Sequence, residues 1–101
     1  MTDRVTDKVK ASELIKEQKE RESKKKIIFD KIYVLIERKI VMASKSDNYF
    51  TWFQIPEFMV GLSLYSFKDC VEHIQNKLKN NGFKTEFYKP NILYIDWNPN
   101  K

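Results

Sequence analysis

Residues 27–44 read IIFDKIYVLIERKIVMAS, and this stretch decides the fold because its apolar side chains recur with helical spacing. Apolar residues three or four positions apart share one face of an α-helix, and such a stripe packs against a core. We therefore predict a helix that docks its apolar stripe on the body of the protein. The stripe consists of Ile28, Ile32, Leu35, Ile36, the pair Lys39 and Ile40, and Ala43.

The same helix extends towards the N-terminus. Residues 11–26 (ASELIKEQKERESKKK) are almost all strong helix formers, and no helix breaker separates them from the stripe. We predict one helix from about Lys8 to Ser44. The apolar side chains of its first part are limited to Leu14, Ile15 and one alanine, so we expect this part to project into water.

This pattern divides the chain into two parts. Residues 1–26 are a charged N-terminal extension, mostly projecting helix, and residues 27–101 are a compact α+β domain. A domain of this size buries a small core, and such domains often depend on a partner or on oligomerisation for stability. We therefore expect a protein partner or a homo-oligomer.

Tyr49–Ile55 (YFTWFQI) is predicted to be the first strand, since aromatic and β-branched residues favour strands. Pro56 lacks a backbone N–H for the sheet and ends the strand. The segment from Pro56 to Val60 can form one short helical turn that Gly61 stops.

A second helix and a hairpin follow. Ser66 is placed as the N-cap, and Gly82 is the left-handed residue that ends the helix. Lys84–Tyr88 and Ile92–Trp97 are predicted strands, joined by a turn that contains Pro90. The buried stripe of the helix is expected to be Phe67, Cys70, Val71, Ile74 and Leu78.

The element order is helix, strand, short helical turn, helix, strand, strand, which predicts an α+β fold. A long N-terminal helix, a three-stranded antiparallel sheet and a second helix form it. The same order permits a winged-helix-like topology, in which the second helix would recognise DNA and the hairpin would be the wing.

The chemical motifs of enzymes are missing from the sequence. The single histidine, His73, follows Asp69 by one helical turn, and we interpret the two as an ordinary pair on a helix surface. Gly61 and Gly82 stand alone, so no phosphate-binding loop is present. Cys70 is the single cysteine, which leaves no cysteine-based metal site. We expect no enzyme activity, no cofactor, no metal and no small-molecule substrate.

The apolar run around Ile32–Ile36 is too short and too interrupted to cross a bilayer, so we expect no membrane association. The net charge of +5 permits attraction to nucleic acid or to an acidic partner. Candidate nucleic-acid contacts are Lys24, Lys25 and Lys26 on the first helix and Lys77 and Lys79 on the second. The alternative is a solvated helix that its own i,i+4 ion pairs stabilise.

Aromatic and apolar side chains offer candidate protein contacts. Two helices can cover one face of a three-stranded sheet and leave the other face open. On that reasoning Trp52, Tyr88 and Tyr94 mark an interface, with core packing as the alternative. Leu14 and Ile15 form a short apolar patch for a partner helix on the projecting part.

Three segments resemble small uncharacterised proteins of giant nucleocytoplasmic large DNA viruses. They are ASELIKEQKERESKKKIIFDKIY, TWFQIPEFMVGLSLYS and NNGFKTEFYKPNILYIDW, and together they span about Ala11 to Trp97. The FQIPEF segment and the hairpin from Gly82 to Trp97 are the most specific parts. The resemblance implies expression in the cytoplasm of an infected host cell and is compatible with packaging in the virion. It brings no established activity and no catalytic residues.

Two function classes follow. The first is a small non-enzymatic viral interaction or structural protein that binds protein partners through its sheet and projecting helix. The alternative is a basic accessory protein that binds nucleic acid with a winged-helix-like domain.

Overall fold

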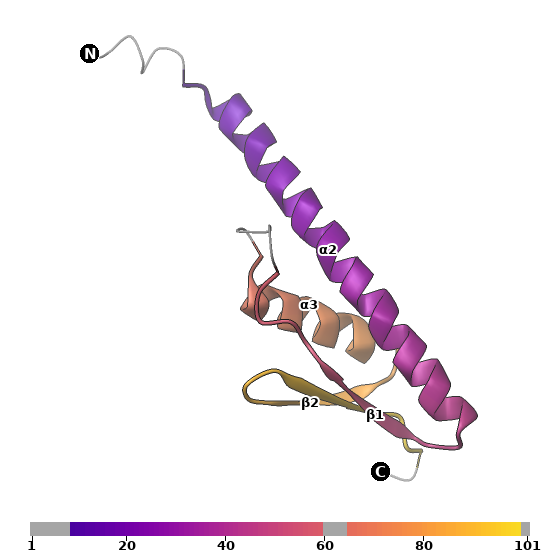
Figure 1. Cartoon of the computed structure of the whole chain (residues 1–101). Helices are drawn as coiled ribbons and strands as arrows, with labels where there is room; N and C mark the ends of the chain where they lie inside the picture. Colours follow the sequence, from indigo (N-terminus) through magenta and orange to yellow (C-terminus); the bar gives the residue numbers. More distant parts are fainter. Residues whose placement is uncertain (1–8, 60–64, 100–101) are drawn as a thin grey trace.

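The computed structural model describes residues 9–59 and 65–99 of the chain. Figure 1 shows α2 as one long helix that crosses the body of the protein and extends beyond it. The predicted α+β class, with a long helix, a three-stranded antiparallel sheet and a second helix, is confirmed. The elements are α2 (Ala11–Lys45), β1 (Phe50–Gln54), α3 (Phe67–Asn80), β2 (Lys84–Tyr88) and β3 (Ile92–Asp96).

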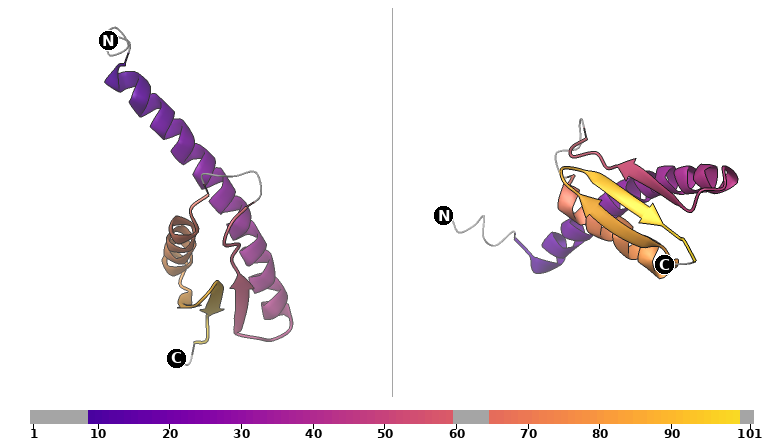
Figure 2. Two further views of the ribbon diagram at one scale, coloured as in Figure 1. Left: turned by 60° about the vertical axis from the view of Figure 1, so that its left-hand side comes forward. Right: turned by 90° about the horizontal axis from the view of Figure 1, so that it is seen from below.

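The sheet has the strand order β1-β3-β2, and both pairs of strands are antiparallel. In the register of the sheet, Tyr94 of the central strand lies between Trp52 of β1 and Glu86 of β2. Side chains alternate between the two faces of a strand, so these three residues share one face. The helices α2 and α3 both lie on the opposite face (Figure 2).

The core fills the space between the two helices and the covered sheet face. Ile32, Ile36 and Ile40 of the predicted α2 stripe are buried, which confirms that this part of the helix docks on the body. From the other elements the core takes Ile55, Cys70, Val71, Ile74, Leu78, Leu93 and Ile95.

The buried face of α2 is rotated towards α3 relative to the predicted stripe. Phe29 and Tyr33 are each 6% exposed, whereas Leu35 is 46% exposed, so the prediction for Leu35 is wrong. The reason is that α2 packs against α3 as well as against β1. The Phe29 ring lies 5.4 Å from the ring of His73, and Asn81 donates a hydrogen bond of 3.3 Å to the Tyr33 hydroxyl.

The ends of α3 follow the predicted local signals. The Ser66 hydroxyl accepts a 3.3 Å hydrogen bond from the backbone N–H of Asp69, as an N-cap does. Gly82 has a φ of 90°, and the N–H of Phe83 donates to the carbonyl of Leu78 at 2.9 Å. This is the backbone pattern that closes a helix with a left-handed glycine.

The predicted helical turn after β1 is wrong as far as the structure describes it. Residues 56–59 are not helical, while Val60 and Gly61 lie outside the described residues. Ile55 is held instead by Asn91, whose carbonyl accepts its N–H at 2.8 Å and whose side-chain amide donates to its carbonyl at 3.0 Å. The Pro56 carbonyl accepts a 2.6 Å hydrogen bond from the Tyr65 hydroxyl, so these contacts hold the chain extended.

This segment bears on the winged-helix alternative. A helix-turn-helix unit needs a helix directly before its recognition helix. Between β1 and α3, residues 55–59 and 65 are not helical. Within the described ranges, therefore, α3 has no preceding helix to form such a unit.

Candidate functional site

The face of the sheet turned away from the helices is aromatic. The alternation of side chains places Phe50 and Trp52 of β1, Tyr94 of β3 and Tyr88 of β2 on this face. Phe50, Trp52 and Tyr88 are each about half exposed, and Tyr94 is half-buried among them. We call these four residues the aromatic face.

Contacts between neighbouring side chains hold the aromatic face in place. The rings of Phe50 and Tyr94 are stacked, with centroids 5.9 Å apart. The ammonium of Lys39 on α2 lies 4.4 Å from the centre of the Trp52 ring. Such a cation–π contact contributes about 0.5–1 kcal/mol at an exposed site. The aromatic face is therefore ordered before any partner arrives.

The charges on this face have both signs. Asp96 lies between Phe50 of β1 and Lys84 of β2 in the register of the sheet, and Glu86 lies beside Tyr94. The Tyr88 hydroxyl donates a 3.2 Å hydrogen bond to the Glu86 carboxylate. Surfaces that stack nucleic-acid bases combine aromatics with a positive groove. This face instead carries the exposed carboxylate of Glu86 and the buried one of Asp96.

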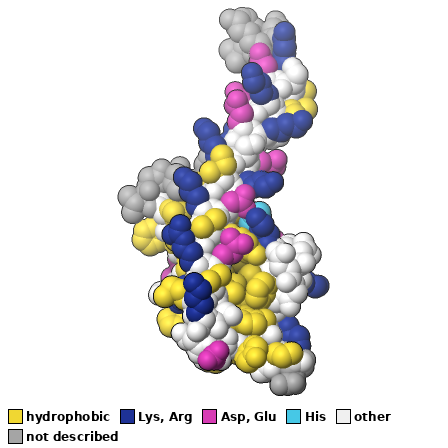
Figure 3. Space-filling model, turned by 90° about the vertical axis from the view of Figure 1, so that its right-hand side faces the viewer, with side chains coloured by type: hydrophobic (Ala, Val, Ile, Leu, Met, Phe, Trp, Pro, Cys, Tyr) yellow, Lys and Arg dark blue, Asp and Glu magenta, His cyan; other side chains and the backbone are white. Residues whose placement is uncertain are grey.

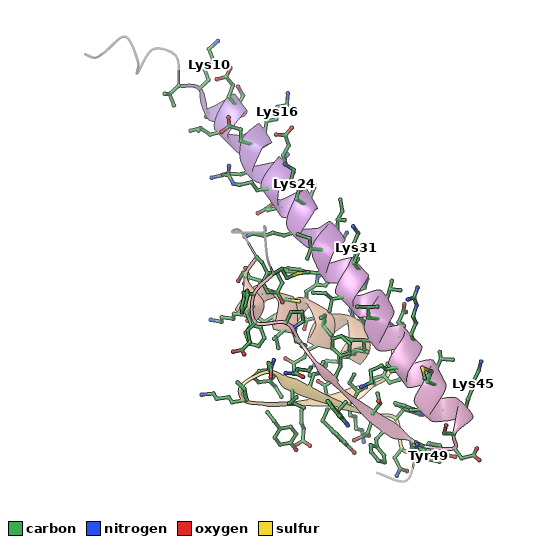
Figure 4. The ribbon with its side chains drawn as sticks, in the orientation of Figure 1. Lys10, Lys16, Lys24, Lys31, Lys45 and Tyr49 are labelled. Atoms are coloured by element: carbon green, nitrogen blue, oxygen red, sulfur yellow. The ribbon has the colours of Figure 1, made fainter. Side chains whose placement is uncertain are left out.

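The N-terminal part of α2 projects beyond the body, as Figure 4 shows around Lys16. Leu14 and Ile15 lie on this part and are 48% and 49% exposed. Their predicted place outside the core is confirmed, since neither belongs to the buried cluster.

The predicted nucleic-acid contacts have different environments. Lys24, Lys26 and Lys79 are exposed, and Lys25 is half-buried. Lys77 is held within the fold, because its ammonium lies 3.1 Å from the Asp30 carboxylate and 4.7 Å from the centre of the Tyr33 ring. Lys77 therefore joins the two helices and does not offer an uncommitted positive charge to a phosphate.

Asp30 also pairs with His73, at 3.1 Å from its Nε2 atom. The expected pair of His73 with Asp69 is therefore wrong. Desolvation by burial acts to raise the pKa of Asp30, but hydrogen bonds from His73 and Lys77 outweigh it and lower the pKa. The cluster stabilises the contact between α2 and α3, and it presents no nucleophile beside its histidine.

The single cysteine is not a reactive site. Cys70 lies fully buried in the core, and desolvation by burial raises the pKa of its thiol, although a hydrogen bond with Tyr65 opposes the shift. A thiol that stays protonated is a poor nucleophile and a poor metal ligand.

An apolar groove lies between the C-terminal ends of α2 and α3 and was not predicted. It has a volume of about 500 Å³. The rings of Phe83 and Trp97 meet edge to face in its wall at 5.7 Å. The α2 part of its lining ends at Lys45 and the rest begins at Asn81, 36 residues later, so no local pattern indicates it.

Neither a metal-binding cluster nor a membrane-spanning helix occurs among the described residues. Residues 9–59 and 65–99 hold no group of three or more His, Cys, Asp or Glu side chains that could bind a metal ion. In the same ranges no helix is long and apolar enough to cross a membrane.

Comparisons with known proteins identify relatives of unknown role. Residues 9–79 match the model of a family described as a family of unknown function, DUF5759. An uncharacterised protein of Acanthamoeba polyphaga mimivirus is 36% identical over 83 residues, which cover 76% of this chain and 68% of the relative. No solved structure matches the chain.

Proposed function

Because the chain belongs to the DUF5759 family of unknown function and has a relative in a giant virus, we propose its role from its exposed surfaces. It is a small, non-enzymatic viral protein that binds a protein partner through the aromatic face. No cofactor and no small-molecule substrate take part.

The aromatic face carries this proposal. Phe50, Trp52 and Tyr88 are 48%, 50% and 52% exposed on one side of a single sheet. Clusters of exposed aromatic side chains mark interaction sites. On binding, each such side chain buries a large apolar area and loses little rotamer freedom. The stacking of Phe50 on Tyr94 and the contact of Lys39 with Trp52 fix their positions before binding.

Affinity purification from infected cells tests the proposal. A partner recovered with the natural chain should be lost with Trp52→Ala and with Tyr88→Ala. It should be kept with Phe58→Ser, a matched control at an aromatic that is 76% exposed and outside the sheet. Sedimentation velocity of the purified chain decides between a second copy and a different protein. Equal recovery by all variants would contradict the proposal.

Nucleic-acid binding is the second candidate, and the exposed Lys24 and Lys26 together with the net charge of +5 support it. If this candidate is right, the affinity for duplex DNA or RNA should fall steeply as the salt concentration rises. A mobility-shift assay at low and high salt should then show weaker binding when Lys24, Lys25 and Lys26 become Ala. An absence of binding at low salt would remove this candidate.

We also propose that the protein acts in the cytoplasm of the infected host cell and is packaged in the virion. The relative in a giant virus supports a viral setting. Immunoblotting of gradient-purified virions after protease treatment tests packaging, and absence of the protein from them would contradict it.

A further inference from the structure

A repeat of seven residues runs along α2 on the side opposite the core. From residue 24 to residue 45 the sequence follows the pattern basic-x-x-apolar-apolar-x-x three times and ends on a further basic residue. Seven residues are close to two helical turns, so equivalent positions form a row about 10 Å apart along one side of the helix. The basic row is Lys24, Lys31, Arg38 and Lys45.

Apolar side chains flank the basic row on both sides. In a helix, Ile27, Val34 and Val41 follow one edge of this row, and Leu35 and Met42 follow the other. Their exposed fractions range from 43% for Val34 to 69% for Met42. Figure 3 shows Lys and Arg side chains next to hydrophobic ones along α2, with Asp and Glu side chains beside them. We call the basic row and these five apolar residues the outer face of α2.

The basic row is available for binding. None of its four members joins an ion pair in the part of the chain that the structure describes, and all four are exposed. Lys39 and Lys77, in contrast, are already engaged by Trp52 and Asp30. Lys31 and Lys45 extend from the side of α2 that is turned away from the sheet (Figure 4).

The acidic residues of this part of α2 border the outer face on the side of α3. Asp30 bonds to His73 and Lys77 of α3. Glu37 lines a depression together with Val41 of the outer face and with Asn81 at the end of α3. From Lys24 to Lys45 the outer face therefore combines positive charge with exposed apolar area, and the carboxylates of Asp30 and Glu37 lie along its α3 edge.

We propose that the outer face of α2 binds an acidic amphipathic helix of a partner protein. The partner helix carries a carboxylate every seven residues, with apolar side chains on both sides of that row. Two helices that pair side by side repeat their contacts every seven residues, which matches the repeat on α2. Each carboxylate then pairs with a Lys or Arg of the basic row, and the flanking apolar side chains of both helices are buried against each other.

Other occupants fit this face less well. A second copy would place one basic row against another, and like charges oppose such a dimer. A nucleic-acid backbone would neutralise the lysines, but it would leave Val34, Val41 and Met42 without apolar partners. An anionic membrane favours a continuous apolar face with cations at its borders, whereas here the cations form the centre.

Binding of designed peptides to the full chain tests the inference, independently of the aromatic face. The first probe is a fluorescent helical peptide of roughly four heptads with the repeat Glu-x-x-Leu-Leu-x-x, and the second replaces each of those Glu by Lys. The variant Lys31→Glu/Arg38→Glu reverses the central charges, and Val34→Ser/Leu35→Ser removes apolar flanks. Phe58→Ser, at an exposed aromatic residue outside the helix and the sheet, is the control.

The Glu peptide should bind the natural chain, and its affinity should fall about tenfold or more for each of the first two variants. The Lys peptide should prefer the charge-reversed variant to the natural chain by a similar factor. Phe58→Ser should leave both affinities unchanged. None of these variants touches the aromatic face, so failure of the aromatic face and failure of this inference are distinguishable.

Three results would overturn the inference. The first is no binding of the Glu peptide at about 100 µM. The second is equal binding by the charge-reversed variant, with circular dichroism showing an intact fold. The third is tighter binding to phosphatidylserine vesicles or to duplex DNA than to the Glu peptide, lost in the same variant.

Discussion

At the scale of single residues, Asp30 joins the two helices through one oxygen atom. Its Oδ1 lies 3.1 Å from both His73 Nε2 and Lys77 Nζ. Burial opposes the charged form, but these hydrogen bonds lower the pKa of Asp30 below the ordinary value of 3.8. A lowered folded-state pKa contributes stability above pH 3.8 that is lost as the pH falls through the folded-state pKa.

Asp30→Asn is therefore expected to destabilise the fold at neutral pH and to have little effect in acid. The loss should be about 1 kcal/mol or less, because the Asp30 side chain is 39% exposed and water screens the pairs. Urea unfolding at pH 7 and at pH 3 measures the difference. Asp47→Asn is the control, since Asn accepts the φ of 63° at that position. Equal losses at the two pH values would contradict the role of Asp30.

Which residue contacts were predictable depends on their separation in sequence. The Ser66 cap and the Gly82–Phe83 helix end are local patterns within a few residues, and both were correct. The pairing of Asp30 with His73 spans 43 residues, so the sequence favoured the nearer Asp69 instead. No local pattern reports how two helices are rotated when they pack.

At the scale of elements, α2 has two faces with different roles. Ile36 is fully buried and its neighbour Leu35 is 46% exposed. The predicted stripe includes both, because the residue type alone does not distinguish an apolar side chain in a core from one on an exposed surface. The heptad repeat from Lys24 to Lys45 is the signal that separates the faces, and it is visible in the sequence alone.

These neighbours provide a matched test of the docking geometry. Ile36→Ala should lower the free energy of unfolding by about 2–5 kcal/mol, because it leaves a cavity in the core. Leu35→Ala should change it by about 0.5 kcal/mol or less, as expected at a solvent-exposed position. Thermal or urea unfolding measures both, and similar losses would show that α2 is rotated from the position described.

The sheet was predictable in its strands but not in its exposed face. The runs of aromatic and β-branched residues located β1 and the hairpin. Whether Trp52, Tyr88 and Tyr94 lie in a core depends on which elements cover the sheet, and the sequence left that open. The structure places α2 and α3 on the opposite face, which leaves these rings outside the core cluster.

At the scale of the whole molecule, the projecting helix makes the protein elongated. Its extents are 66 × 25 × 20 Å, and its radius of gyration is 18.7 Å. A compact domain of 100 residues has a radius of about 13 Å. Small-angle scattering of the monomer should give a radius near 18.7 Å. A value near the compact one would mean that the first turns of α2 fold back on the body.

The unbroken course of α2 past the body has a geometric consequence. Leu14 and Ile15 belong to the same unbroken helix as the turns that dock on the body. The number of residues between them and those turns therefore sets their angle around the helix axis relative to the sheet. Deleting one residue near Ser23 would swing that apolar pair by about 100° around the axis and shorten the rod by about 1.5 Å. The continuous helix thus fixes the direction in which Leu14 and Ile15 point relative to the aromatic face.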